Sequence, residues 1–256
     1  MTWKPRKGKA KKMPDSRWEI HRDERAVNKQ AWEKKPRLRK EYGRLYKKMK
    51  ERMAPGPSLE IGSGMGNIKM WIPEITTSER DLSEDVDRQE TAYRLNYRAG
   101  ELGNIVAMDV WHHLEFPARA LGEWRRCLRP GGRVILMEPA MGLLGQIIYG
   151  LVHHEPVGWR VRFGGAEDWS DEKEAYFACQ SSGHRHFLKK ENPDILAGWK
   201  LETEEIAAVA YMTTGGFSKP ELGPEWVASA IRGLEPALEQ LPRLFATRLL
   251  VILERE

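Results

Sequence analysis

The segment that most constrains the fold of this chain is a glycine-rich loop that follows a short apolar run. Its sequence is Ser58-Leu-Glu-Ile-Gly-Ser-Gly-Met-Gly-Asn67. Three glycines at alternate positions let the backbone turn sharply and let a ligand approach without a Cβ in the way. The spacing of Ile68, Met70 and Trp71 predicts a helix after the loop, and amides at a helix start suit a charged or polar ligand group. A tight strand-to-helix turn without a ligand is the alternative interpretation.

The spacing of the glycines distinguishes between ligands. The pattern is G-x-G-x-G, whereas dinucleotide-binding turns have G-x-G-x-x-G, and no G-K-[ST] is present, which excludes a nucleotide P-loop. Glu60 lies two positions before Gly62. A carboxylate there repels a pyrophosphate but attracts the ammonium of a methionine group. The loop therefore favours S-adenosylmethionine, and it resembles motif I of the class I S-adenosylmethionine-dependent methyltransferases.

Two segments after the loop extend this resemblance. Residues 75–79 resemble the second strand of the family, and its final acid, Glu79, lies 17 residues after Gly62. The resemblance implies that this carboxylate accepts the ribose hydroxyls. Residues 91–97 resemble the segment that lines the adenine, although Thr91 stands where the family has Asp. Glu90 is an alternative partner for the adenine.

The resemblance continues to residue 139. Residues 104–110 resemble a buried fourth strand, and residues 118–128 have helical spacing. The turn at 129–132 and the strand at 133–139 resemble the L-x-P-G-G segment of the methyltransferase type 11 group. The rest of the chain predicts a helix over 187–196, a strand over 201–211, a helix over 224–241 and a last strand over 248–254.

The family resemblance implies an α/β fold with a Rossmann-like, seven-stranded, mostly parallel sheet flanked by helices. Its ligand lies at the carboxyl ends of the strands. The interval between strands two and three is short, which predicts that one usual helix is missing. The implied cofactor is S-adenosylmethionine, with S-adenosylhomocysteine as product, bound by Glu60, Gly62, Ser63, Gly64, Gly66, Asn67, Glu79, Thr91, Ala92 and Asp109.

The charge of the chain predicts two parts. Residues 1–52 hold 20 Lys and Arg against 7 Asp and Glu, whereas the whole chain has a formal net charge of +5. We expect a basic extension over 1–55, disordered at first and then helical, because apolar residues between Leu38 and Met53 form one stripe. The methyltransferase domain then covers 56–256, with a substrate or lid insert at 151–195. The extension could bind nucleic acid, a phosphorylated substrate or the acidic body of its own domain.

Two histidine pairs are candidates for the chemistry. His112 and His113 directly follow the fourth strand, and His153 and His154 follow the apolar run 141–152. Histidine suits proton transfer near neutral pH. The alternatives are that the first pair is structural and that the second caps a helix end. In the second cluster Glu155 is a further candidate to face the acceptor.

No metal site is predicted, because neighbouring histidines do not place well-spaced ligands on one face. A site built from the second pair together with His184 and His186 is the weaker alternative. Cys127 and Cys179 are too few for a disulfide framework, and no run of apolar residues is long enough to span a membrane. A cytoplasmic location is the simplest expectation.

We therefore expect a methyltransferase that acts on an oxygen or nitrogen atom of a small or medium-sized acceptor. Two alternatives remain open. The basic extension could bring RNA or a peptide to the site, or the chain could be a binding or scaffold protein that keeps the fold without catalysis. The acceptor and the oligomeric state do not follow from the sequence.

Overall fold

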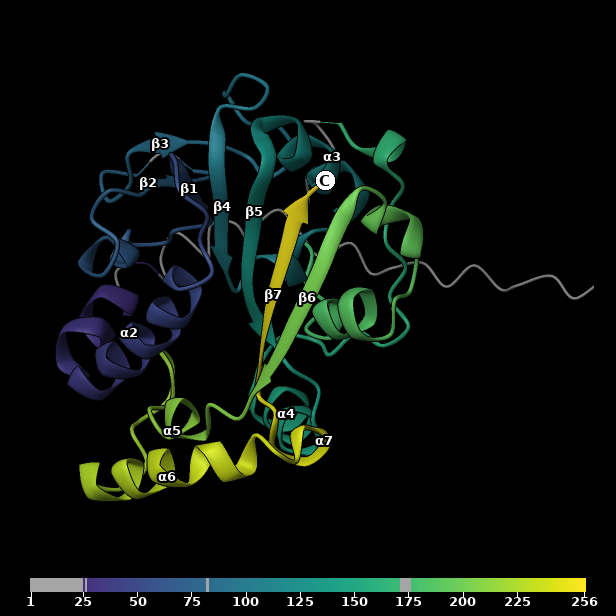
Figure 1. The fold of residues 1–256 in the computed structure, drawn as a ribbon. Helices are drawn as coiled ribbons and strands as arrows, with labels where there is room; N and C mark the ends of the chain where they lie inside the picture. Colours follow the sequence, from purple (N-terminus) through teal and green to yellow (C-terminus); the bar gives the residue numbers. More distant parts are fainter. Residues whose placement is uncertain (1–24, 26, 82, 171–175) are drawn as a thin grey trace, which may run out of the picture.

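The computed structural model describes residues 25, 27–81, 83–170 and 176–256. One sheet runs through it in the order β3-β2-β1-β4-β5-β7-β6 (Figure 1). The pairs from β3 to β5 are parallel, and β7 is antiparallel to both β5 and β6. The predicted Rossmann-like sheet is therefore confirmed. Its strands are β1 (Ser58–Ile61), β2 (Thr76–Glu79), β3 (Arg88–Gln89), β4 (Leu102–Met108), β5 (Leu128–Pro139), β6 (Trp199–Ile206) and β7 (Arg248–Arg255).

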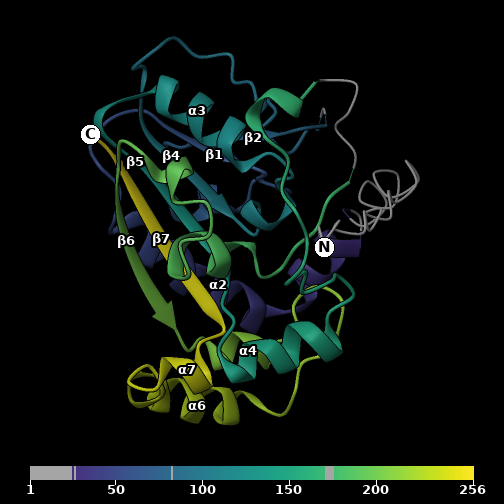
Figure 2. The same ribbon diagram turned by 90° about the vertical axis from the view of Figure 1, so that its right-hand side faces the viewer.

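The sheet is buried on both faces, as the continuous apolar sequence of its central strands requires. All seven residues of β4 are buried. Ile105 and Ala107 belong to one core cluster, whereas Val106 and Met108 belong to the other, because successive side chains of a strand point to opposite faces. The helix α3 (Pro117–Cys127) packs on the first face and α2 (Pro36–Lys50) on the second (Figure 2).

Helix α2 is the helix that the apolar stripe of the extension predicts. It begins at Pro36, whose fixed φ suits the first position of a helix. Its apolar face packs on Ile68 and Ile72, next to the glycine loop. The buried apolar residues of that face are Leu38, Tyr42, Leu45, Tyr46 and Met49. The expected disordered segment, residues 1 to about 20, lies outside the described part.

The prediction of a helix after the glycine loop was wrong. The structure has only one 3-10 turn there, η1 (Asn67–Met70). Pro73 explains why the turn does not continue, because proline disfavours the helical conformation of the residue before it. Helix α2 covers this part of the sheet instead. Between β2 and β3, residues 80–81 and 83–87 form no helix, as the short interval predicts.

Two further elements differ from the prediction. The helix expected over 187–196 is two short pieces, a π-helical turn η6 (His184–Leu188) and a 3-10 turn η7 (Pro193–Leu196), separated by the left-handed Asn192 at φ 56°. The strand expected over 201–211 is β6, which ends at Ile206. Ala208 has a φ of 35° and begins the short helix α5 (Val209–Met212).

The remaining helices gather beyond the carboxyl ends of β4 and β5 (Figure 1). They are α4 (Leu143–Ile147), continued by the π-helical η3 (Ile148–Val152), with α6 (Glu225–Leu238) and α7 (Pro242–Phe245). Within residues 151–170 and 176–195 there is no strand, only short helical turns that include η4 (Ala166–Asp168). Among the described helices, none combines the length and the apolar character that a membrane crossing requires.

Candidate active site

The three glycines of the loop all have positive φ, but for different reasons. A Cβ on Gly62 would lie 2.5 Å from Cγ2 of Val110, and one on Gly66 would lie 2.5 Å from the backbone oxygen of Asp85. These two positions need glycine for close packing. A Cβ on Gly64 would have no neighbour within 4 Å. The loop therefore has open space at Gly64, where a ligand can approach the backbone.

Glu79 lies at the end of β2 and fixes the loop by accepting backbone hydrogen bonds. The N–H of Gly64 donates to its Oε1 at 2.7 Å, and the N–H of Arg80 donates to its Oε2 at 3.2 Å. Burial raises the pKa of Glu79 above its usual range. A carboxylate at this place can order the loop and can also accept hydroxyl groups from a ligand that lies over Gly64.

Glu60 lies buried under the loop with only one oxygen paired. The hydroxyl of Tyr46, on α2, donates to Oε1 at 3.2 Å, while Oε2 is buried and has no partner among the described residues. Burial raises the pKa of Glu60 to about 7. The unpaired oxygen is suited to an ammonium or another donor. The residues around the loop thus fit S-adenosylmethionine.

The other predicted cofactor residues have less open surroundings. The Ser63 hydroxyl accepts the N–H of Ser78 at 3.0 Å, so it fixes the loop to β2. Asn67 begins η1, and Thr91 and Ala92 follow β3. The Ala92 carbonyl accepts the indole N–H of Trp124 at 2.9 Å. Glu90, the alternative adenine partner, is buried and accepts the N–H of Asn96 at 2.9 Å.

Asp109 pairs with an arginine that the sequence analysis did not single out. It follows β4 with a left-handed φ of 58°, and its carboxylate pairs with the guanidinium of Arg248. Arg248 is only 3% exposed and lies over the ring of Tyr211, 4.6 Å from its centroid. The pair joins the end of β4 to the start of β7.

His112 and His113 lie in the 3-10 turn η2 (Trp111–His113), directly after β4. The turn is fixed by Glu138, near the end of β5 and fully buried, whose Oε1 accepts the N–H groups of Val110 at 2.8 Å and Trp111 at 2.7 Å. The other oxygen of Glu138 lies 2.7 Å from Nδ1 of His112.

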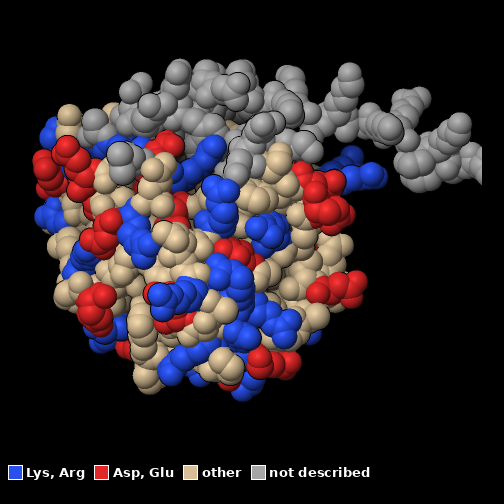
Figure 3. Space-filling model, turned by 90° about the horizontal axis from the view of Figure 1, so that it is seen from above, with Lys and Arg blue, Asp and Glu red and all other residues tan. Residues whose placement is uncertain are grey.

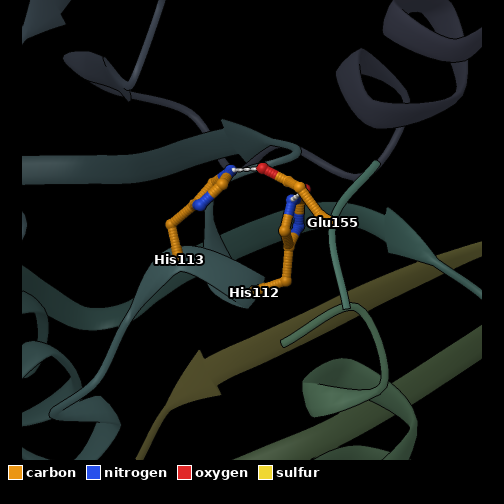
Figure 4. Close-up of side chains that lie close together, drawn as sticks. All are labelled: His112, His113 and Glu155. Atoms are coloured by element: carbon orange, nitrogen blue, oxygen red, sulfur yellow. Dashed lines mark ion pairs between the residues drawn. The ribbon is translucent and has the colours of Figure 1, made fainter. Parts of the chain in front are cut away.

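Both histidines face Glu155 (Figure 4). Nε2 of His112 lies 3.5 Å from Oε2 of this carboxylate, and Nε2 of His113 lies 3.6 Å from its Oε1. Nδ1 of His113 lies 2.9 Å from the carbonyl oxygen of Phe177. Because a carbonyl only accepts, this Nδ1 carries the proton and leaves Nε2 toward Glu155. We call His112, His113 and Glu155 the histidine–carboxylate cluster.

Glu155 is buried and has further hydrogen bonds. The hydroxyl of Tyr176 donates to Oε1, and the amide of Gln180 donates to Oε2. The neighbouring histidines and these donors hold the pKa of Glu155 well below its usual range, although burial opposes this. The pKa of His112 is raised to about 10 despite its burial, because Glu138 and Glu155 flank the ring.

The structure separates the second predicted histidine pair from the cluster. His153 and His154 are exposed and stack on each other with ring centroids 4.7 Å apart. His153 stays near the cluster, since its Nδ1 accepts the N–H of Glu155 at 3.2 Å. His186 accepts the indole N–H of Trp111 at 3.1 Å, and His184 packs on Trp159, so neither joins His153 and His154.

The rings of His112 and His113 have centroids 4.2 Å apart, and each directs Nε2 at the same carboxylate. Glu138, Gln180 and Arg248 were missed. No local pattern marks them, since each acts on a residue at least 25 positions away in the chain.

Comparison with known proteins agrees with this geometry. Residues 59–136 match the family model described as a methyltransferase domain. A protein of Thermotoga maritima, described as a S-adenosylmethionine-dependent methyltransferase and possible histamine N-methyltransferase, is 16% identical with a TM-score of 0.51. The match covers 94% of this chain and 99% of that chain.

Two other solved structures are similar at lower scores. A S-adenosylmethionine-dependent methyltransferase of Archaeoglobus fulgidus is 17% identical, with a TM-score of 0.48 over 85% of this chain and 94% of that chain. A protein of Galdieria sulphuraria, described as a putative sarcosine dimethylglycine methyltransferase, is 13% identical, with a TM-score of 0.46 over 82% and 85%. Among curated proteins, none matches the sequence.

Proposed function

We propose a reaction in which this chain uses S-adenosylmethionine as its cofactor. The chain has the fold of the class I S-adenosylmethionine-dependent methyltransferases and a segment that matches a methyltransferase domain. The reaction is transfer of the methyl group to an oxygen or nitrogen atom of a small or medium-sized acceptor. The observation that carries the proposal is the place of the histidine–carboxylate cluster. It follows β4, at the edge of the sheet where such folds bind their ligands.

The cluster and the glycine loop are neighbours. The side chain of Val110 lies against Gly62, and η2 begins at the next residue. A cofactor over Gly64 and an acceptor at His113 would therefore lie side by side. The side chain of His113 is 26% exposed and that of His112 is 4% exposed. His113 is the member of the cluster that an acceptor can reach.

The cofactor residues have separate tasks in this proposal. Glu79 accepts the ribose hydroxyls, and the unpaired oxygen of Glu60 lies on the side of the methionine ammonium. S-adenosylmethionine supplies the electrophilic methyl group when it is bound. Thr91, Ala92 and Asp109 stay candidates for the adenine and methionine contacts.

The acceptor side must orient a nucleophile in line with the methyl group and, for a hydroxyl or protonated amine, take up a proton. The cluster offers two ring nitrogens and a carboxylate that converge on one point. Buried hydrogen bonds from Glu138, Tyr176 and Gln180 fix their orientation, which favours a preorganised site. His153 and His154 are then outer residues at the entrance.

The alternative of a nucleic-acid acceptor, recruited by the basic extension, has weaker support than a small-molecule acceptor. Most cations on the described part of the extension already pair with acids of the body, so that they serve intramolecular docking. The pairs are Arg25–Asp81, Lys29–Asp85, Arg37–Glu221, Lys40–Glu225, Arg44–Glu235, Lys48–Glu204, Lys50–Glu74 and Arg52–Glu204. On the visible part of the face in Figure 3, basic and acidic side chains are interleaved.

Calorimetric titration of the purified chain with S-adenosylmethionine and S-adenosylhomocysteine tests the cofactor half of the proposal. A panel of hydroxyl and amine acceptors, followed by release of S-adenosylhomocysteine, tests the acceptor half. We expect His113→Gln to lower turnover at least tenfold while the affinity for S-adenosylmethionine stays within twofold. The absence of binding by either ligand would instead favour a non-catalytic scaffold.

A further inference from the structure

The two nitrogen-to-oxygen distances in the histidine–carboxylate cluster are longer than those of ordinary hydrogen bonds. The two Nε2-to-carboxylate distances are 3.5 and 3.6 Å, whereas N–H···O bonds measure about 2.7–3.2 Å. Two ligand atoms that each lie about 2.1 Å from one tetrahedral ion are roughly 3.4 Å apart. One ligand atom from each of the three residues lies within 4.8 Å of the others. The two nitrogen-to-oxygen distances are close to those between ligands around a shared ion, and the remaining separation, at up to 4.8 Å, would shorten when the ion binds.

The protons of the two rings are on the atoms that a metal site requires. Nδ1 of His112 faces the Glu138 carboxylate at 2.7 Å, and Nδ1 of His113 faces the Phe177 carbonyl at 2.9 Å. Each Nδ1 therefore donates, and each Nε2 is the nitrogen left for a ligand. Histidines that bind metals are held in this way, with the second ring nitrogen donating to a carboxylate or a backbone carbonyl.

The carboxylate is oriented as well. The Tyr176 hydroxyl and the Gln180 amide each donate to one oxygen of Glu155. Glu155 and Glu138 are both buried on either side of the His112 ring, so a cation bound at Nε2 would take the place of the ring proton between two carboxylates. A buried charge needs a partner of opposite sign. A divalent cation at the convergence point would neutralise both.

From this geometry we propose that His112, His113 and Glu155 bind a divalent transition-metal ion. Two imidazoles and one carboxylate suit Zn²⁺, Fe²⁺, Mn²⁺ or Co²⁺, whereas Mg²⁺ and Ca²⁺ prefer oxygen ligands. Three protein ligands leave at least one position open, as in catalytic sites.

This inference rests on the proposed function, because it places the open position where the acceptor is expected. An oxygen atom of the acceptor, either a hydroxyl or a neighbouring oxyanion, would complete the coordination. The histidines would then hold the cation, and a hydroxyl bound to it would have a lowered pKa and would release its proton to solvent instead of to a histidine.

Titration of the chelator-treated full chain with Co²⁺, followed by its visible absorption, tests the site. We expect one equivalent to bind, with visible bands typical of nitrogen and oxygen ligands, and Zn²⁺ to displace it. Glu155→Gln and His113→Gln should each weaken binding at least tenfold. Glu138→Gln should weaken it about 10- to 100-fold through the orientation of His112. Circular dichroism confirms that each variant is folded.

His184→Gln is the matched control, because this histidine lies in the same insert and outside the cluster, and it should bind Co²⁺ as the parent chain does. Equal binding by His113→Gln and the parent chain would overturn the proposal. A parent chain that binds no Co²⁺ would also overturn the proposal. It would show that hydrogen bonds hold the three side chains together without a metal ion. The calorimetric affinity for S-adenosylmethionine is measured separately, so failure of the metal site is distinguishable from failure of the methyltransferase proposal.

Discussion

At the residue scale, Glu60 connects the glycine loop to the stability of the fold. Its folded-state pKa of about 7 exceeds the value of 4.5 expected when it is exposed. The folded state therefore favours the protonated acid. The stabilisation is fully present below pH 4.5 and is lost as the pH rises through 7.

We expect Glu60→Gln to remove this dependence, because the amide oxygen still accepts the Tyr46 hydroxyl and carries no charge to desolvate. Between pH 5 and pH 8 the parent chain should lose about 2 kcal/mol of unfolding free energy relative to the variant. Urea unfolding of both proteins at the two pH values measures the difference. Parallel pH profiles would show that Glu60 is not the responsible group.

Glu79 permits a second test at the residue scale, which separates loop ordering from ligand binding. We expect Glu79→Ala to weaken S-adenosylmethionine binding at least tenfold, about 1.4 kcal/mol, because it removes both the acceptor of the Gly64 N–H and the carboxylate for the ribose. Glu79→Gln keeps an acceptor for Gly64 and should lose less. Calorimetry measures both, with the exposed Glu74→Ala as control. Unchanged affinity in Glu79→Ala would remove this residue from the site.

At the scale of elements, α2 takes the place of the helix that the sequence predicted after β1. It stacks Tyr46 on Trp71 with ring centroids 5.4 Å apart and buries Met49 completely. Residues 36–50 of the extension therefore pack into the core of the domain that follows them.

The contribution of α2 can be measured by truncating one buried side chain. We expect Met49→Ala to lower the unfolding free energy by about 2–4 kcal/mol, the usual loss for a buried large side chain. Lys47→Ala, on the exposed face of the same helix, should change it by less than about 0.5 kcal/mol. Chemical denaturation compares the two variants, and equal effects would mean that α2 does not contribute to the core.

The elements show which sequence signals were sufficient. Apolar runs and glycine turns identified β1, β4, β5 and β7, since a strand buried on both faces has a distinctive continuous pattern. The signals failed where one residue stopped a periodic pattern, as Pro73 does after η1 and Ala208 does after β6. The apolar spacing continues past both residues, so periodicity alone placed the ends wrongly.

At the scale of the whole molecule, the Asp109–Arg248 pair ties together two strands that are not neighbours in the sheet. Asp109 ends β4, Arg248 begins β7, and β5 lies between them. Asp109→Asn keeps a side chain that tolerates the left-handed backbone but leaves Arg248 buried without an anion.

We expect Asp109→Asn to lower the unfolding free energy by about 3 kcal/mol, as for other broken buried pairs. Combining it with Arg248→Met should recover part of that loss, because the uncompensated charge is then gone. A double-mutant cycle by urea unfolding measures the coupling. Purely additive losses would mean that the two side chains act independently.

The candidate site could be predicted only where it is local. The glycine loop, Glu60, Glu79 and the pair His112–His113 stand in or next to short recognisable segments. The two histidines meet Glu155 because of the path of the insert and because Glu138 orients His112. No local sequence pattern reveals either cause.

The division of the cluster between two stretches of chain has a consequence for how such a protein can change. The loop, Glu79 and both histidines all precede β5, whereas Glu155 and its partners Tyr176 and Gln180 come from the insert after it. Under the proposed function, the cofactor residues and both histidines are encoded in one portion of the gene, and the carboxylate that the histidines face is encoded in the next. Exchange of the second portion alone could alter which molecule is modified while the first portion continues to supply the same reactive group.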